Sequence, residues 1–171
     1  MLNKENIINL LHSKGIGFEI FEHQPFFTVI DSKKFRNKMK GAHTKNLFLK
    51  NKKNNFFLLS YEESEGVNLK KISKALNLGN VSFAREEYLS GYLGIKPGSV
   101  SPFALLNDQK GDVDFYLEKK LYESDIVNFH PLINTFTITI PTNSFLKFMI
   151  ENNKKIHIFS SDQGKIIKTY E

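Results

Sequence analysis

The stretch Gly41-Ala-His-Thr-Lys-Asn-Leu-Phe-Leu-Lys50 decides how the rest of the chain is interpreted. A turn of small residues runs directly into an apolar run, 47–49, that has the character of a strand. A second apolar run, 56–60, follows after a polar, asparagine-rich segment, 50–55. Two such runs around a polar tip predict a β-hairpin. Lys45 and Asn46 then lie at the start of its first strand, where a lysine beside a glycine turn is also a common surface feature.

Apolar periodicity predicts helices before and after the hairpin in the chain. These helices are expected at 3–14, at 33–39 with Asp31 as the cap, after Asn68, at 85–91, and after Pro141 with Thr142 as the cap. Short apolar or alternating runs predict further strands at 17–22, 81–84, 113–117, 126–129, 135–140 and 155–159. Residues 103–106 are expected to be extended, and residues 160–171 to be frayed or loosely docked.

This order of elements predicts the fold class. Strands outnumber helices and often follow one another directly, which favours an α+β fold with a mixed or antiparallel sheet over a doubly wound parallel sheet. No composition break, linker or internal repeat divides the chain. We therefore expect one domain spanning 1–171.

Composition narrows the class of partner without deciding it. The 171 residues carry a formal net charge of +6 and a sequence pI near 9.3. This charge favours an anionic partner such as nucleic acid, although a solvated lysine-rich surface would have the same composition. No apolar run is long enough to span a bilayer, and the N-terminus lacks the apolar core of a secretory signal. We expect a soluble, cytoplasmic protein that does not interact with membranes.

Several standard catalytic motifs are missing from the sequence. There is no cysteine, and the five histidines show no close pair at zinc-ligand spacing. Neither a Gly-x-Ser-x-Gly elbow nor a phosphate-binding glycine loop occurs. We therefore expect no metal, no cofactor and no catalytic triad. Any hydrolysis would have to rely on positioning and electrostatic stabilisation.

Two later segments, taken together with residues 41–50, form a recognisable set of motifs. They are the loop Leu93-Gly-Ile-Lys-Pro-Gly-Ser-Val-Ser-Pro-Phe103 and the segment Val127-Asn-Phe-His-Pro-Leu-Ile-Asn-Thr135. In this order, the three motifs resemble the YbaK/prolyl-tRNA-synthetase-associated family, in its branch of free-standing prolyl-tRNA editing deacylases (ProX or PrdX). The resemblance covers nearly the whole chain, from Phe18 to the helix after Pro141. It implies a curved mixed sheet that closes toward a barrel, with helices around it.

The resemblance also implies a set of site residues. Lys45 matches the lysine that the family needs for activity, and a lysine there could hold the terminal ribose and phosphate or stabilise an oxyanion. The loop residues Gly98, Ser99, Val100, Ser101 and Pro102 match a Gly-x-x-x-Pro loop whose backbone brackets the substrate's α-amino group and the attacking water. Without the resemblance, this loop would be taken for a structural turn.

Four further residues complete the implied substrate pocket: Asn46, His130, Phe27 and Thr28. His130 has an alternative interpretation as a hydrogen-bonded core histidine, and Phe26 is expected in the core.

The implied activity is hydrolysis of the ester of mischarged tRNA(Pro), with alanine as the expected cargo. A proline pocket cannot strongly reject a smaller apolar amino acid by binding alone, so a second site must remove the error. Cysteine, serine or threonine as cargo, and a non-catalytic tRNA-binding module, remain as alternatives. The expected partner is the acceptor end of tRNA(Pro), with prolyl-tRNA synthetase or an elongation factor as possible further partners.

Overall fold

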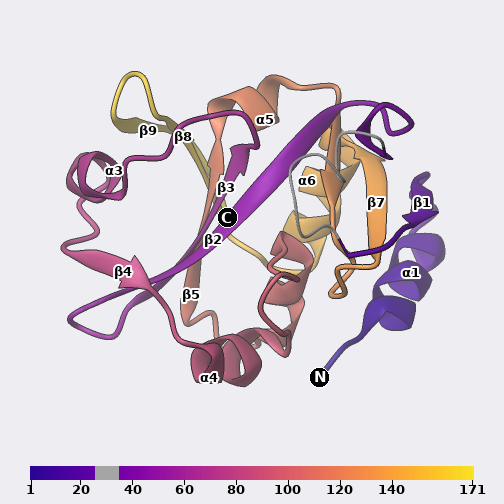
Figure 1. Cartoon of the computed structure of the whole chain (residues 1–171), viewed down its shortest axis with the longest axis horizontal. Coiled ribbons are helices and arrows are strands. Elements are labelled where there is room, and N and C mark those ends of the chain that lie inside the picture. The colour runs from indigo at the N-terminus through magenta and orange to yellow at the C-terminus, as the bar shows by residue number, and fades with distance from the viewer. Residues whose placement is uncertain (26–34) are drawn as a thin grey trace.

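The predicted hairpin is present in the computed structural model, which describes residues 1–25 and 35–171. Strand β2 (Ala42–Asn51) pairs antiparallel with β3 (Phe56–Glu62), and Lys45 lies opposite Tyr61. Figure 1 shows β2 crossing the middle of the molecule, so the quoted stretch is central to the architecture.

The hairpin is the centre of one mixed sheet. Its strands follow the order β1-β7-β6-β2-β3-β5-β8-β9, and β4 pairs with β2 beside this path. The pairs β2/β6, β3/β5 and β5/β8 are parallel, and the others are antiparallel. The remaining strands are β1 (Glu19–Glu22), β4 (Val81–Phe83), β5 (Val113–Glu118), β6 (Ile126–Phe129), β7 (Phe136–Pro141), β8 (Ile156–Ser160) and β9 (Lys165–Tyr170).

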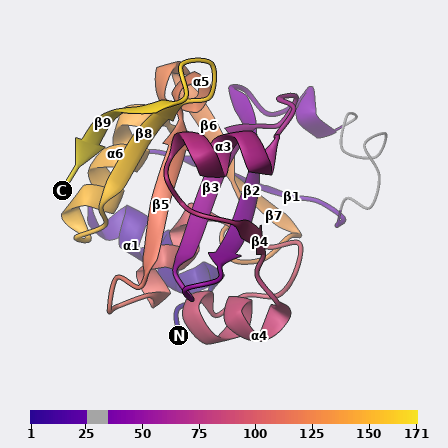
Figure 2. The ribbon, with the colours of Figure 1, turned by 90° about the vertical axis from the view of Figure 1, so that its left-hand side faces the viewer.

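Helices lie on both faces of this sheet (Figures 1 and 2). The α-helices are α1 (Lys4–Ser13), α3 (Leu69–Ala75), α4 (Glu86–Tyr88), α5 (Lys119–Glu123) and α6 (Thr142–Glu151). A π-helical turn, Leu89–Leu93, continues α4, and a 3₁₀ helix spans Pro102–Asn107. The fold class is thus confirmed: one α+β domain with a mixed sheet. Within the described chain the end strands β1 and β9 do not pair, so the sheet stays open.

Two hydrophobic cores form on the two faces of the sheet. The larger contains Leu11 of α1, Phe145 of α6 and Phe103, all fully buried. The smaller lies under α3, where Ile72 and Leu76 pack against β2 and β3. Because strand side chains alternate between faces, successive residues of β2 point into different cores. Both faces of β2 are therefore constrained by packing.

One edge of β2 changes partner along its length. Its first residues pair with β6, in the register Ala42–Val127 and His43–Asn128. Its last three residues, 49–51, pair with β4. Among the described residues, no strand pairs with this edge between those two points. The opening coincides with Lys45 and Asn46.

Gly41 makes the junction between β2 and β6 possible. Its φ is +84°, and a Cβ built there would lie 2.4 Å from the backbone O of Ile126 and 2.6 Å from its Cβ. Any other residue would have to adopt a left-handed backbone and push β6 away. The glycine thus sets where β2 begins relative to β6.

Most of the predicted elements are confirmed. The helix at 4–13 is capped by Asn3, whose side chain accepts a hydrogen bond from the backbone N of Asn6 (3.0 Å). Asn68 caps α3 as predicted, accepting from the backbone N of Lys71 (3.0 Å), and Asn77 takes the left-handed position at its end. Asp31 and the first two residues of the predicted helix at 33–39 lie outside the described residues; of the rest, residues 35 and 36 are helical and residues 37 and 38 form a turn.

The prediction of an extended segment at 103–106 is wrong, because these residues belong to the 3₁₀ helix. Its start carries a recognisable signal: Ser101 is the N-cap, with its hydroxyl accepting from the backbone N of Phe103 (3.3 Å), and Pro102 occupies the first helical position.

Two predictions near the C-terminus are also wrong. The Thr142 side chain does not cap α6; its hydroxyl donates to the backbone O of Ser124. The end of the chain is not frayed, because β9 forms an antiparallel pair with β8. The short helix α5 was not predicted. Among the described residues, no helix is both long enough and apolar enough to cross a bilayer.

Replacing Gly41 by alanine should destabilise the protein much more than the same change at Gly111. Gly111 has a similar φ, +72°, but nothing lies within 4 Å of its virtual Cβ. We expect Gly111→Ala to cost about 1 kcal/mol, for the left-handed backbone alone. Gly41→Ala adds the clash with Ile126 and should cost at least about 3 kcal/mol. Urea unfolding measures both, and equal losses would contradict a role for the close contact with β6.

Candidate active site

Lys45 lies on the α3 face of β2, at the open edge. Its ammonium donates a hydrogen bond to the backbone O of Glu65, in the connection between β3 and α3. The side chain is partly buried, and its charge is one of the influences that lower the pKa of Glu63. Lys45 is thus a positioned cation beside a carboxylate rather than a free surface lysine.

Asn46 points to the opposite face of β2, as strand alternation requires. Its side-chain oxygen accepts a hydrogen bond from the Ser60 hydroxyl at 2.5 Å, across the hairpin. Its amide nitrogen donates to the Thr44 hydroxyl at 3.4 Å. Lys45 and Asn46 are neighbours in sequence but face different sides of the sheet.

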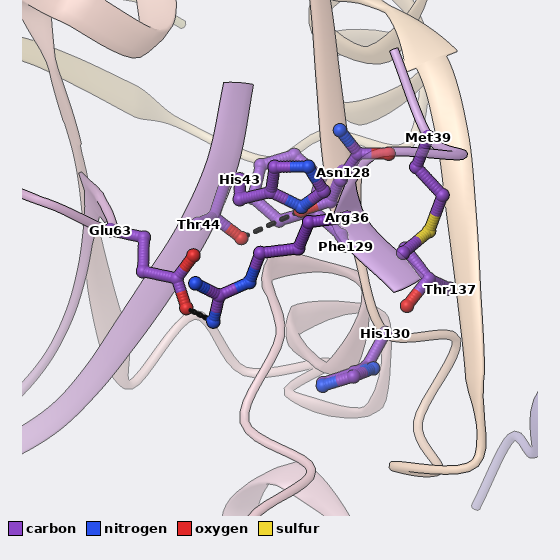
Figure 3. A pocket seen from close by; sticks show the side chains of 9 residues that line it. All are labelled: Arg36, Met39, His43, Thr44, Glu63, Asn128, Phe129, His130 and Thr137. Carbon is purple, nitrogen blue, oxygen red and sulfur yellow. Dashed lines mark hydrogen bonds and ion pairs between the residues drawn. The ribbon is translucent and has the colours of Figure 1, made fainter. Parts of the chain in front are cut away.

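A small cavity of about 60 Å³ opens where β2 leaves β6 (Figure 3). Figure 3 shows the Arg36 guanidinium directed at the Glu63 carboxylate, with which it forms an ion pair. The Thr44 hydroxyl donates to the backbone O of Asn128 at 2.7 Å, bridging β2 and β6 where they separate. The cavity is lined by Arg36, Met39, His43, Thr44, Glu63, Asn128, Phe129, His130 and Thr137.

Burial changes the acid–base behaviour of the cavity's ionisable groups. Burial raises the pKa of Glu63, while the positive charge of Arg36 acts in the opposite direction. Burial also lowers the pKa of His43, and the nearby Arg36 adds to that effect. A neutral imidazole and a carboxylate held by a guanidinium therefore share this space.

His130 lies at the end of β6, and its ring is fixed. Its Nδ1 is 2.7 Å from the backbone O of Phe136. Since a carbonyl can only accept, Nδ1 carries the proton, which leaves Nε2 as an acceptor. Burial lowers the pKa of His130, and the neighbouring His23, with ring centroids 6.0 Å apart, contributes in the same direction. The neutral ring can accept a hydrogen bond from a ligand or a water molecule.

Asn128 acts as a structural clamp for the cavity. Its amide nitrogen donates to the backbone O of Lys40 (2.8 Å) and of Ala42 (3.1 Å), and its oxygen accepts from the Thr139 hydroxyl. These bonds tie β6 to β7 and to the turn that begins β2. Asn128 therefore holds the wall of the cavity in place.

The loop 98–102 is exposed at Gly98 and becomes buried toward Pro102. Gly98 has a φ of +84°, and its virtual Cβ would lie 3.4 Å from the Asn134 side chain. Ser99 and Ser101 are buried, and Val100 packs against the larger core. Ser99 also lines a wider groove, about 550 Å³, between this loop, the 132–134 connection and the start of α1. The residues that line this groove and those that line the small cavity do not overlap.

The structure brings only part of the predicted site together. His130 lines the cavity, and Lys45 adjoins it through Glu63. Asn46 faces the other side of β2, and Ser99 faces the wider groove. Phe27 and Thr28, and Phe26, which was expected in the core, lie outside the described residues.

Several cavity residues were not predicted. His43 and Asn128 stood within the quoted motifs but were given no role. Glu63 could have been predicted from the register of the hairpin. It follows β3 directly, and its backbone N donates to the backbone O of His43 (2.9 Å). Arg36 comes from a separate segment and gave no local signal.

Across residues 1–25 and 35–171, no group of three His, Asp or Glu side chains is arranged to hold a metal ion. The site instead offers cations, a carboxylate and neutral imidazoles, which can orient and stabilise charge during an ester hydrolysis.

Comparison with known proteins identifies the class. The model of the aminoacyl-tRNA editing domain family matches residues 23–148, and the chain belongs to this family. The Xenopus laevis prolyl-tRNA synthetase associated domain-containing protein 1 is 35% identical over 151 residues, covering 85% of this chain and 89% of the relative. Prolyl-tRNA editing protein ProX of Acetoanaerobium sticklandii is 29% identical over 150 residues, covering 87% and 92%.

Solved structures agree on the fold. The crystal structure of a protein described as a candidate trans-editing enzyme for prolyl tRNA synthetase superimposes with a TM-score of 0.66 at 15% identity, covering 90% of this chain and 93% of that chain. The YbaK/prolyl-tRNA-synthetase-associated resemblance is thereby confirmed.

His130 should make stability depend on pH below neutrality. Its pKa is lowered in the folded state, so the unfolded chain binds the proton more readily. Stability is then fully present above about pH 6.5 and is lost as the pH falls toward the folded pKa. His130→Asn keeps a donor for the Phe136 carbonyl but does not titrate. It should reduce the slope of stability against pH by up to about 1.4 kcal/mol per pH unit in that window.

Urea unfolding at several pH values between 7.5 and 5 tests this expectation. Asn134→Ala, in the same connection, is the control, since it changes no titratable group. The slope should remain finite in the His130 variant, because His43 and His157 also have lowered pKa values. An unchanged slope would mean that the buried ring is protonated without cost.

Proposed function

We propose that the chain acts as a single editing domain, 1–171, that hydrolyses alanine from mischarged tRNA(Pro) in trans, in the cytoplasm. The observation that carries this proposal is the positioned ammonium of Lys45 beside the small cavity at the open edge of β2. Membership of the aminoacyl-tRNA editing family and the likeness to a ProX protein support the substrate class.

Lys45 is assigned to stabilise the oxyanion. Its ammonium now donates to a neutral acceptor, the Glu65 carbonyl. When water attacks the ester carbon, the carbonyl oxygen becomes negatively charged and competes for the same donor. A charge-assisted hydrogen bond to an oxyanion is roughly twice as strong as one between neutral groups. The ammonium thus favours the transition state over the ground state, as catalysis requires.

The remaining steps need no side-chain nucleophile. The water oxygen forms a bond to the carbonyl carbon, the bond to the ribose oxygen breaks, and that oxygen takes up a proton. His130 Nε2, an acceptor in the neutral ring, can orient the water or a ribose hydroxyl. The resemblance also assigns the backbone of loop 98–102 to the substrate's α-amino group and Asn46, Phe27 and Thr28 to the substrate pocket, although among the described residues the loop lines the separate groove and Asn46 faces the other side of β2.

Cargo selection is assigned to steric exclusion in the editing pocket, which would admit the small alanine side chain and reject the larger proline ring. The correctly charged product would then be spared by steric exclusion. Cysteine and serine are small enough to compete with alanine, and threonine is the largest of the alternatives.

A non-catalytic tRNA-binding module is the second function to be tested. It would keep the fold and the basic surface but would not use Lys45. Prolyl-tRNA synthetase and an elongation factor are the partners that could deliver the substrate to either kind of protein.

Deacylation of tRNA(Pro) charged separately with alanine, cysteine, serine, threonine and proline distinguishes these possibilities. We expect fast loss of alanine and retention of proline. Lys45→Ala should lower kcat/KM by about 10²- to 10³-fold, the usual cost of losing one oxyanion donor. Lys45→Arg, which keeps the charge, should retain more activity, and thermal unfolding of each variant controls for folding.

Each outcome has a separate meaning. Preferential loss of cysteine, serine or threonine would keep the enzyme but change its cargo. Full activity in Lys45→Ala would refute the role of the ammonium. If none of the five esters is hydrolysed, the binding module is the better description.

A further inference from the structure

A basic surface with an exposed aromatic side chain lies on the same side of the sheet as Lys45. From Gly66 to Arg85 the chain has four basic residues and no acidic one. Three of the four, Lys70, Lys71 and Lys74, are exposed on α3. Among the described residues, none of these three lysines takes part in an ion pair. Their charge is therefore available to a partner.

Phe83 stands beside this helix. It lies on β4, which contacts α3, and Figure 2 shows the two elements next to each other over β2 and β3. Phe83 is 63% exposed, an unusual state for a phenylalanine on a paired strand. We define the α3/β4 surface as Lys70, Lys71, Lys74 and Phe83.

The sheet register connects this surface to Lys45. Phe83 lies opposite Leu49, and Leu49 is four residues after Lys45 on the same strand. Residues opposite each other, and residues an even number apart, point to the same face. At about 3.3 Å per residue, the two positions are separated by about 13 Å along β2. An unpaired RNA end could reach from one to the other.

Lysines together with an exposed aromatic ring match the chemistry of RNA. Ammonium groups neutralise phosphates, and a flat ring stacks on an unpaired base without selecting its identity. Glu86 and Glu87, exposed at the start of α4, limit the basic surface beyond Arg85. We propose that the α3/β4 surface binds the RNA next to the reacting ester, with Phe83 stacking on an unpaired base and the α3 lysines contacting phosphates.

This proposal rests on the proposed function for the choice of RNA, but its test is separate from hydrolysis. The probe is an uncharged hairpin RNA with a short stem and an unpaired 3′ end that finishes in CCA. Its affinity is measured by fluorescence anisotropy over a series of salt concentrations. The variants are Phe83→Ala and a triple change of Lys70, Lys71 and Lys74 to alanine.

The matched control is a triple change to alanine of Lys110, Lys147 and Lys155, which are exposed away from α3 and β4. It removes the same net charge. We expect the α3 triple variant to weaken binding at least tenfold and to reduce the salt slope by about 2, as the loss of two or three phosphate contacts predicts. The control should weaken binding much less. Phe83→Ala should weaken binding at least about fivefold with little change in slope.

Equal losses in the two triple variants, or no loss with Phe83→Ala, would overturn the assignment. Absence of any RNA binding would do the same, and the surface would then serve another partner, such as an acidic protein. In deacylation of alanyl-tRNA(Pro), the α3 variants should show a raised KM. Failure of all deacylation would refute the proposed function while leaving the affinity comparison intact.

Discussion

The close contact between Gly41 and Ile126 is the constraint on which the site depends. It allows β2 to begin against β6, and the pairing is then lost after two residues because β2 continues toward β4. A strand that stayed paired along its whole edge would leave no opening at Lys45. Where the strand pairing stops, side-chain hydrogen bonds of Asn128 and Thr44 join β2 and β6. These bonds satisfy backbone carbonyls at the edge of the opening.

Because side chains alternate along a strand, Lys45 and Asn46 lie on opposite faces of the sheet. One residue is held over the α3 face beside Glu63, and the other is bonded to Ser60 on the opposite face. A change at either position therefore acts through a different part of the molecule. The Asn46–Ser60 bond joins two residues that face each other in the hairpin and so favours this register; a shift of one residue would turn the lysine to the other face. Asn46 can thus matter for activity by keeping Lys45 in place.

Local signals in the sequence predicted the hairpin, the fold class and most of the elements, because each depends on residues close together in the chain. The Asn68 cap and the apolar runs of β2 and β3 are of this kind. The errors have equally local causes: Ser101-Pro102 is a helix start that was taken for a loop, and β9 is exposed and so has little apolar pattern. The Arg36–Glu63 pair could not be predicted, since it joins segments whose approach is set by the whole fold.

The distribution of charge around the cavity bears on the proposed reaction. The ester of the proposed substrate is intrinsically labile, so a large part of the proposed task is to bring the right ester to a positioned cation and keep the wrong ones out. Neutral His43 and His130, with pKa values lowered by burial, do not compete with Lys45 for the developing negative charge. Arg36 forms an ion pair with Glu63, so its positive charge is also less available to an oxyanion. The Lys45 ammonium donates to a carbonyl that an oxyanion could replace, and this is why the proposed mechanism assigns it the charge that develops when the ester carbon is attacked.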